Sequence, residues 1–319
     1  MKKLFTMLTL AVVLCGCTQA EPIIDTPTPE PTVSAQPSPY LSDARPIAVM
    51  IDNDDESARP PAGVEDAYMV YEITVEGAAT RMMALFKNYS VEKVGPVRSA
   101  RHYFLDYALE NDAIYAHAGQ SPQAGRDINA LKMADINGLD GLDGQYFHRD
   151  YSQTSGWHTL FTGTNRLAEF AQTQGYRNTT DVALYPYNLT DEDISGDSAK
   201  SFLLPYAPFY QLSFKYNAKD KVYERYINGK AHKAQSGVTL SAKNVIVLYM
   251  DNYNLNDGTN AGRQELDNLG SGKGFYMTNG KYKEITWSKA SRRAKTILKD
   301  KSGTEITLNP GVTYVQIIP

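Results

Sequence analysis

Two arginines and a serine stand in the segment best suited to binding an anion. Arg98 and Arg101 are three residues apart, with Ser99 between them and Pro96 just before. This spacing predicts a helix over residues 96–109 that carries both guanidinium groups on one face. A helix N-terminus has unpaired N–H groups and a partial positive charge. We therefore predict that this segment binds phosphate, carboxylate or sulfate.

Further polar side chains could extend this site. His117 ends a strand predicted over residues 112–117, and Ser121 precedes a proline as the cap of the next helix. A later loop carries Arg149 and His158. Imidazole and guanidinium groups would add titratable and fixed positive charge. The predicted ligand-binding residues are Arg98, Arg101, Ser99, His117, Ser121, Arg149 and His158.

A structural charge network is the alternative interpretation of the same arginines. Residues 67–75 and 80–86 predict a β-hairpin. Glu72 and Glu76 are four residues apart, so they are expected on the same face of this hairpin, and Arg81 is expected across from them. Arg98 or Arg101 could neutralise these carboxylates at a partly buried junction, where losing one partner costs about 3–5 kcal/mol. The sequence leaves both interpretations open.

Catalysis is the weaker functional alternative. His117 and His158, with a carboxylate from Glu72 or Asp150, could supply the acid and base of a hydrolase or transferase. Nothing in the sequence fixes the geometry of these groups relative to one another. The sequence therefore favours a binding protein over an enzyme.

The sequence predicts neither a metal centre nor a cofactor. His148 and His158 lie near Asp150, but their spacing of ten residues matches no helix-borne zinc motif. The pair Gly272-x-Gly274 falls well short of a dinucleotide-binding fingerprint.

The first seventeen residues predict export and attachment to lipid. Lys2 and Lys3 precede an apolar run over residues 4–14, which is too short to span a bilayer and is typical of a signal peptide. The run ends in Leu14-Cys15-Gly16-Cys17, which resembles a lipobox. We expect residues 1–17 to form a lipoprotein signal, with diacylglycerol and acyl chains such as palmitate on Cys17. An ordinary secretory signal cut near Ala20, or an uncleaved anchor, is the alternative.

The composition of the processed chain limits its partners. Removal of Lys2 and Lys3 leaves 30 basic against 36 acidic residues. This balance argues against general nucleic-acid binding, which needs a basic face. Loss of Cys15 and acylation of Cys17 would leave no free thiol, so the fold must depend on its apolar core.

A stalk and two globular regions are expected after the signal. Residues 18–44 are rich in Pro, Thr and Ser, which favours an extended, solvated stalk. Residues 45–190 alternate strands and helices, and a polar, acidic linker lies over residues 181–200. Residues 200–319 contain short strands separated by turns such as Asn228-Gly229 and Asn279-Gly280. We predict the α+β class, with a layered sheet-and-helix domain before a mainly antiparallel β domain.

Several strings of residues resemble the YerB-like lipoproteins. They include Gly95-Pro96-Val97-Arg98-Ser99-Ala100-Arg101, Ala116-His117-Ala118-Gly119-Gln120-Ser121-Pro122, and Ile285-Thr286-Trp287-Ser288-Lys289. The resemblance covers residues 45–319. It implies a two-domain fold found mainly in Gram-positive bacteria, with no agreed catalytic residues. One departure is Ser155-Gly156-Trp157-His158, where relatives tend to have Ala-Pro before the histidine.

These observations predict a protein anchored by lipid at the outer face of a cell membrane. Its expected partner is an anionic polymer of the cell wall or a protein of the wall machinery. An envelope hydrolase or transferase that uses His117 or His158 remains the alternative.

Overall fold

The computed structural model describes residues 39–319, with the exception of residues 88, 153 and 260. The expected signal peptide with Cys17, and most of the expected stalk, lie outside the described residues. The described part of the chain forms one compact unit. None of its helices is long and apolar enough to cross a membrane.

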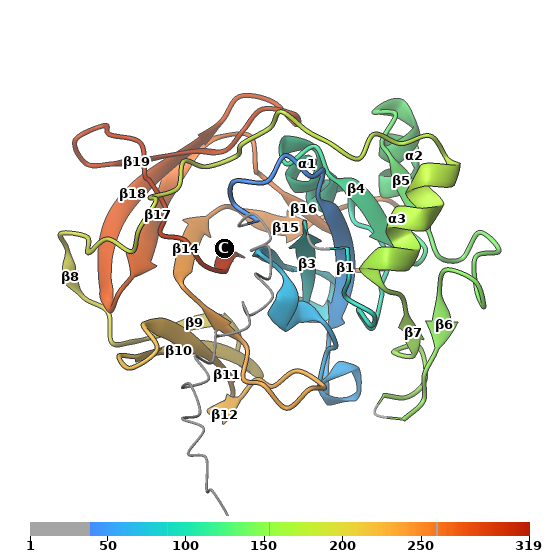
Figure 1. Cartoon of the computed structure of the whole chain (residues 1–319), viewed down its shortest axis with the longest axis horizontal. Helices are drawn as coiled ribbons and strands as arrows, with labels where there is room; N and C mark the ends of the chain where they lie inside the picture. Colours follow the sequence, from blue (N-terminus) through green and yellow to red (C-terminus); the bar gives the residue numbers. More distant parts are fainter. Residues whose placement is uncertain (1–38, 88, 153, 260) are drawn as a thin grey trace, which may run out of the picture. The chain divides into compact units, whose positions relative to one another are not determined.

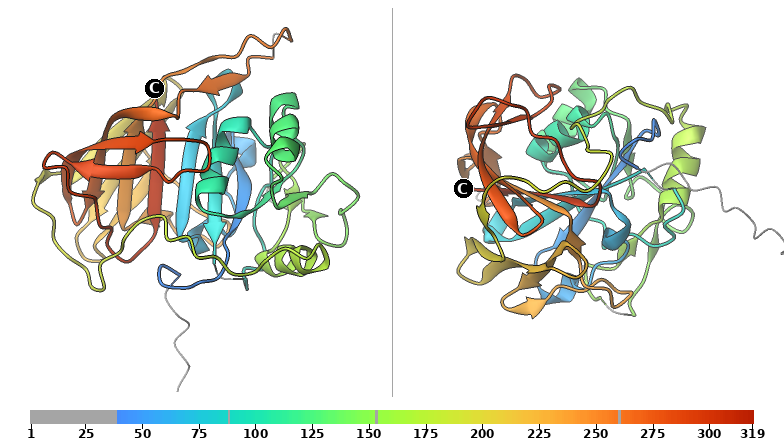
Figure 2. Two further views of the ribbon diagram at one scale, coloured as in Figure 1. Left: turned by 90° about the horizontal axis from the view of Figure 1, so that it is seen from above. Right: turned by 60° about the vertical axis from the view of Figure 1, so that its left-hand side comes forward.

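A large mixed sheet of eleven strands is the main element of the fold (Figure 1). In spatial order its strands are β19 (Ile297–Asp300), β18 (Lys281–Lys289), β17 (Gly270–Thr278), β14 (Asn244–Tyr249), β20 (Thr313–Ile318), β2 (Met69–Thr74), β3 (Thr80–Phe86), β1 (Ile47–Asn53), β4 (Ile114–His117) and β5 (Asp135–Asn137), and β8 (Asp197–Ser198) pairs with β18. Figure 2 shows the strands of the two halves of the chain side by side. Strand β20 joins them, because it is parallel to both β14 and β2.

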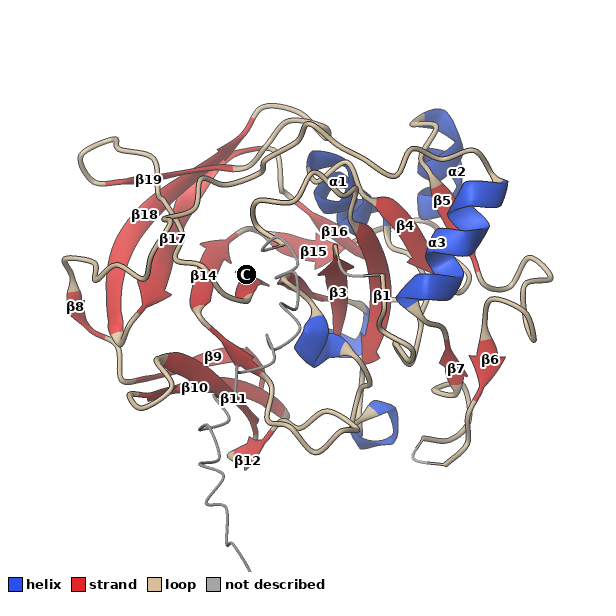
Figure 3. Ribbon diagram, in the orientation of Figure 1, coloured by secondary structure: helices blue, strands red, loops and turns tan. Residues whose placement is uncertain are grey.

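Smaller sheets and three α-helices surround the large sheet. The second sheet contains β12 (Lys230–Ala231), β11 (Val222–Ile227), β10 (Tyr210–Asn217) and β9 (Ser201–Ala207), with β13 (Ser241–Ala242) beside β11. Two strand pairs are β15 (Asn252–Asn254) with β16 (Gln264–Leu266) and β6 (His148–Arg149) with β7 (Leu160–Phe161). The helices are α1 (His102–Glu110), α2 (Pro122–Ala130) and α3 (Thr164–Thr173), with 3-10 turns η1 (Glu56–Ala58), η2 (Val64–Asp66) and η3 (Glu76–Ala78). The α-helices gather beside β1, β4 and β5 (Figure 3), and the fold is α+β, as predicted.

Both faces of the large sheet are covered by apolar side chains. Along β1, Val49 and Ile51 face a core that includes Leu212 and Phe214 of the second sheet. Met50 faces the opposite core, which includes side chains of α1 and α2. Since successive side chains of a strand point to opposite faces, a strand covered on both sides must be apolar throughout. This explains the uninterrupted apolar run that begins at Ile47.

The two predicted Asn-Gly turns are confirmed. Asn228 and Gly229 have φ values of 49° and 79° and connect β11 to β12. Asn279 and Gly280 have φ values of 50° and 72° and connect β17 to β18. Two consecutive positive φ angles define the turn whose twist matches that of the flanking strands. The Asn-Gly pairs therefore fix the register of both hairpins.

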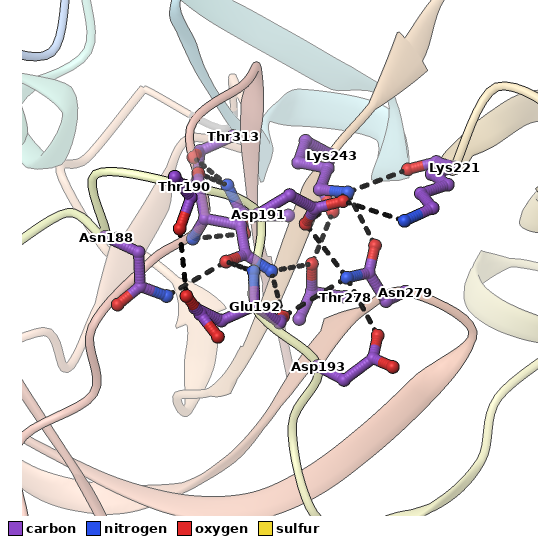
Figure 4. A network of polar contacts seen from close by, with 12 residues as sticks. Asn188, Thr190, Asp191, Glu192, Asp193, Lys221, Lys243, Thr278, Asn279 and Thr313 are labelled. Carbon is purple, nitrogen blue, oxygen red and sulfur yellow. Dashed lines mark hydrogen bonds and ion pairs between the residues drawn. The ribbon is translucent and has the colours of Figure 1, made fainter.

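The polar segment between α3 and β8 forms no regular element, yet it is held in place by hydrogen bonds (Figure 4). The side chain of Asn309 is fully buried, and its Oδ1 accepts from Nδ2 of Asn188 and from the backbone N–H of Glu192, both at 2.9 Å. Its Nδ2 donates to the carbonyl oxygen of Glu192 at 2.7 Å. Nearby, Lys243 lies 2.7 Å from the carboxylate of Asp191. The expected linker is thus tied to the C-terminal half of the sheet.

Replacing Asn309 with Ala should lower the free energy of unfolding by about 2–4 kcal/mol, because both backbone groups of Glu192 lose a buried partner. Urea denaturation of the body (residues 39–319) measures the change. The matched control is Asn188→Ala, which removes a single hydrogen bond to the same side chain and should cost about 1 kcal/mol. Equal losses in the two variants would contradict a central role for Asn309.

Candidate functional site

A buried carboxylate holds two cationic side chains at the end of β1. Asp52 is fully buried, and its Oδ2 lies 2.6 Å from Nδ1 of His158 and 2.7 Å from Nε of Arg98. Its other oxygen, Oδ1, accepts from the backbone N–H of Asp54 at 3.2 Å. The three charged side chains come from β1, from the segment before α1 and from the loop before β7. Asp52 therefore fixes Arg98 relative to His158.

The outer nitrogen atoms of this group remain available. Within the described residues, no hydrogen bond is made by Nε2 of His158 or by the terminal nitrogens of Arg98. The side chain of Arg98 is 22% exposed and that of His158 is 8% exposed. Asp52 thus contacts Nδ1 of His158 and Nε of Arg98. The other nitrogen of the imidazole and the two terminal nitrogens of the guanidinium remain as donors for a ligand. Such a pair of donors can bind an oxyanion, and the imidazole can also exchange a proton.

The electrostatics of the group favour an ionised Asp52 and a protonated His158. Burial by itself would raise the pKa of Asp52, but the hydrogen bond with His158 and the charge of Arg98 outweigh burial and lower it. The hydrogen bond to Asp52 raises the pKa of His158, against an opposing contribution from burial. Asp54 follows on the same segment, and although the residue is exposed, its carboxyl is partly shielded from solvent. This partial burial and the nearby charge of Asp52 raise the pKa of Asp54. The acidic residues Asp54 and Asp55 flank the two cations, so the site is not uniformly positive.

The guanidinium groups of Arg101 and Arg81 are bound to oxygens of the protein itself. Nε and Nη2 of Arg101 bind the two carboxylate oxygens of Glu76 at 2.7 and 2.9 Å, and Nη1 donates to the carbonyl of Ala100. Arg81 is 5% exposed and donates to the carbonyl of Ser99 at 2.8 Å. Burial and the charge of Arg101 lower the pKa of Arg81 to about 10. For these residues the geometry supports the charge-network interpretation.

The helix expected to start at Pro96 is shorter than predicted. Helix α1 begins at His102, with Arg101 as its N-cap, so Arg98 lies outside it. The preceding segment is extended because its backbone groups pair with β1 and with the residues after β4: the N–H of Arg98 donates to Met50, and that of Ala100 donates to Gly119. The prediction that Arg98 and Arg101 share a helix face is therefore wrong.

The other predicted site residues have partners other than Asp52. His117 is fully buried, and its Nδ1 and Nε2 each lie 2.7 Å from an oxygen, of Gly119 and Asp135 respectively. Ser121 caps α2 by accepting from the N–H of Ala124, as expected. Arg149 contacts the hydroxyl of Thr159 at 3.2 Å and the carboxylate of Asp143 at 3.7 Å. His117 and His158 thus have different carboxylate partners.

The neighbours of His148 and Asp150 are cations. His148 lies 3.3 Å from Nη1 of Arg166, and burial and that arginine lower its pKa. Asp150 pairs with Lys93 at 2.5 Å. Among the described residues, no group of three or more His, Cys, Asp or Glu side chains is arranged to hold a metal ion.

A fully buried ion pair was missed by the sequence analysis. Arg225 on β11 binds Glu72 on β2 through Nη1 at 2.8 Å and Nη2 at 3.0 Å, and both side chains are fully buried. Glu72 also accepts from Asn53, Thr80 and Tyr210. Burial opposes the charge of Arg225, but Glu72 more than compensates and raises its pKa. Glu72 therefore belongs to a structural network, as one interpretation held, although its cation comes from the other half of the chain.

The sequence contains a pattern that could have identified Arg225 as a buried charge. In β11 the inward positions alternate with outward ones, and Tyr223 and Ile227 on either side of Arg225 are both buried. A charged residue at an inward position of an alternating strand requires a buried partner.

Comparison with known proteins places the chain in a family. The model for the N-terminal domain of a protein of unknown function, DUF3048, matches residues 32–177, and the model for its C-terminal domain matches residues 204–315. The chain belongs to this two-domain family of YerB-like proteins. It is 28% identical to the "Putative lipoprotein YerB" of Bacillus subtilis (strain 168), over the whole chain and 96% of that protein. The crystal structure of YerB from Bacillus subtilis is similar, with a TM-score of 0.76 and 26% identity over 86% of this chain and 91% of that one.

Replacing Asp52 with Asn should lower the free energy of unfolding by about 1.5–3 kcal/mol at pH 5–6. Because the pKa of Asp52 is lowered, its contribution is present above its usual pKa of 3.8 and is lost as pH falls through the lowered value. Because the pKa of His158 is raised, its contribution is complete below 6.5 and is lost as pH rises through the raised value. Urea denaturation from pH 3 to 9 should therefore show the largest difference between wild type and variant at pH 5–6.

The exposed Asp197 on β8 provides the control for this measurement. The Asp197→Asn variant should follow the wild-type profile at every pH. A difference between wild type and Asp52→Asn that does not vary with pH would contradict the assigned ion pair.

Proposed function

We propose that the protein is a lipid-anchored, extracytoplasmic binding protein that takes an anionic group of a cell-envelope ligand between Arg98 and His158. The observation that carries the proposal is that buried Asp52 holds both cations from the inner side. Their outer nitrogens, which make no hydrogen bond within the described residues, would then be available to one ligand. Preorganised, charge-assisted donors of this kind bind oxyanions more strongly than single flexible side chains do.

The acidic neighbours make the proposed site selective. Asp54 and Asp55 are exposed beside it, so a polyanion cannot approach from every side without repulsion. One phosphate or carboxylate of a larger molecule, such as a wall polymer, would suit the site better than a densely charged chain. Arg101 and His117 are excluded from the proposed contacts because their donor nitrogens already have partners. Ser121 is excluded because it is buried and its hydroxyl oxygen caps α2.

Replacing Arg98 with Gln should weaken binding of pyrophosphate, the small anion used as a probe, roughly 10- to 100-fold, because one charge-assisted hydrogen bond is lost. Isothermal titration calorimetry at low salt measures the change. The matched control is Arg126→Gln, which removes an exposed arginine of α2 that belongs to neither the predicted nor the proposed site. Binding by wild type should also weaken as pH rises through the raised pKa of His158, because the imidazole loses its charge.

Other results of this experiment would contradict the proposal. Equal losses in Arg98→Gln and Arg126→Gln would indicate a diffuse basic surface. Unimpaired binding by a folded Arg98→Gln variant would remove the site. If that variant fails to fold, Arg98→Lys retains the positive charge and should bind with intermediate affinity.

The contact between Asp52 and His158 also favours one enzymatic alternative. An imidazole oriented by a carboxylate through Nδ1 can accept a proton at Nε2, as a general base does when it activates water. The same titration distinguishes the two functions. Recovery of intact pyrophosphate supports binding alone, whereas release of orthophosphate that depends on His158 supports a hydrolase.

We propose that membrane attachment depends on Cys17. The support is the lipobox-like sequence together with the similarity to a protein described as a lipoprotein. Cys17→Ala should therefore move the protein from the membrane fraction to the medium or the soluble fraction, because no acyl chains can be attached.

Cys15 provides the control for membrane attachment. Cys15→Ser changes a thiol two residues away and should leave the protein with the membrane. A Cys17→Ala variant that stays membrane-bound, or an unacylated Cys17 in the mass spectrum of the native protein, would contradict lipid anchoring.

A further inference from the structure

A second candidate site lies in a cleft between the end of β1 and the second sheet. The cleft has a volume of about 780 Å³, which is within the range of small-molecule sites. Its walls include the segment that follows β1, the turn between β2 and β3, and the end of β11 with β12. None of the ligand-binding residues predicted from the sequence lines it.

A buried histidine with an unused nitrogen lines this cleft. His232 is 4% exposed, and its backbone is fixed by hydrogen bonds with Arg225 and Leu240. Its Nδ1 accepts from Nε of Arg225 at 2.9 Å. Its Nε2 is buried and has no hydrogen-bond partner among the described residues. An unpaired buried polar group of this kind is destabilising, and a ligand that supplies an acceptor would recover that cost.

The proton on His232 is placed by its neighbours. Arg225 is held by Glu72 and can only donate, so Nδ1 must be the unprotonated nitrogen. Burial and the charges of Arg225 and Arg59 lower the pKa of His232 well below its usual value, so the ring is neutral. A neutral ring with a bare Nδ1 carries its proton on Nε2. His232 therefore offers one N–H donor and requires an acceptor oxygen from a ligand.

The rim of the cleft carries both signs of charge and an apolar contact. Asp54, Asp55 and Glu56 are exposed on one wall, and Lys230 and Lys233 are exposed on the other. Glu56 and Lys230 approach each other to 4.0 Å while both stay almost fully exposed, so their charges remain available.

A ligand with only one sign of charge would be repelled by one wall. A ligand with separated ammonium and carboxylate groups would match both walls. The ring of Phe209, which is 59% exposed, supplies an apolar surface at the rim.

We infer that this cleft binds a short zwitterionic peptide, with a backbone carbonyl accepting from Nε2 of His232. A peptide combines an acceptor oxygen in every residue with charged termini and side chains. A neutral sugar would supply acceptors but no ammonium group for the acidic wall. The peptide site and the anion site share the acidic neighbours Asp54 and Asp55 but none of the residues proposed to donate to a ligand, so either can fail without the other.

The test is calorimetric titration of the protein with the peptide Ala-Glu-Lys-Ala, with free termini, and with the neutral peptide acetyl-Ala-Gln-Leu-Ala-amide. Wild type should bind the charged peptide at least about tenfold more tightly. His232→Asn retains an acceptor for Arg225 but lacks the Nε2 donor, and should weaken binding about five- to tenfold, the equivalent of one neutral hydrogen bond. Lys230→Glu should weaken it by reversing a charge on the rim.

The matched control for charge is Lys299→Glu, exposed on β19 of the other sheet, which should bind as wild type does. Phe209→Ser changes only the exposed rim and tests the same cleft if His232→Asn fails to fold; it should also weaken binding. The inference is overturned if wild type binds neither peptide, if both peptides bind equally, or if a folded His232→Asn variant retains wild-type affinity.

Discussion

The ion pair between Glu72 and Arg225 determines how the two main sheets fit together. Placing both charges in the interior costs several kcal/mol per ion unless they are paired and hydrogen-bonded. Glu72 meets that requirement by accepting from Arg225, Asn53, Thr80 and Tyr210, which belong to β11, β1, β3 and β10. One carboxylate therefore specifies which positions of five strands must meet. A shift of β11 by one residue would turn Arg225 outward and leave Glu72 unpaired.

Both candidate sites depend on this network. The side chain of Asn53 is bound to Glu72, and neighbouring residues of a strand point to opposite faces, so Asp52 is directed towards Arg98 and His158. On the other side, the guanidinium of Arg225 selects the tautomer of His232. The residues that would contact ligands are thus oriented by groups that no ligand reaches. Their positions are set by folding and need not be created by binding.

Local patterns predicted much of the fold, whereas the contacts of the sites could not be predicted. The hairpin strands Met69–Thr74 and Thr80–Phe86 and the cap at Ser121 were predicted correctly, because strand propensity, turn signals and capping are properties of a few adjacent residues. The start of α1 was misjudged, because strand-like pairing with Met50 outweighs local helix propensity. Asp52 and His158, or Glu72 and Arg225, meet only in the folded chain, and the sequence alone does not give their partners. The sequence did identify Arg98 and His158 as functional candidates, but not Asp52 between them.

The position of β20 has a consequence for how such a protein matures. This strand lies in the middle of the large sheet, between β14 and β2, although it is the last strand of the described chain. Until it is in place, the two halves have no common strand, and each presents an open edge that can pair with other chains. Contacts between segments so distant in sequence form slowly. A chain that crosses a membrane from its N-terminus would therefore be most exposed to aggregation and proteolysis during the interval before residues 313–318 emerge.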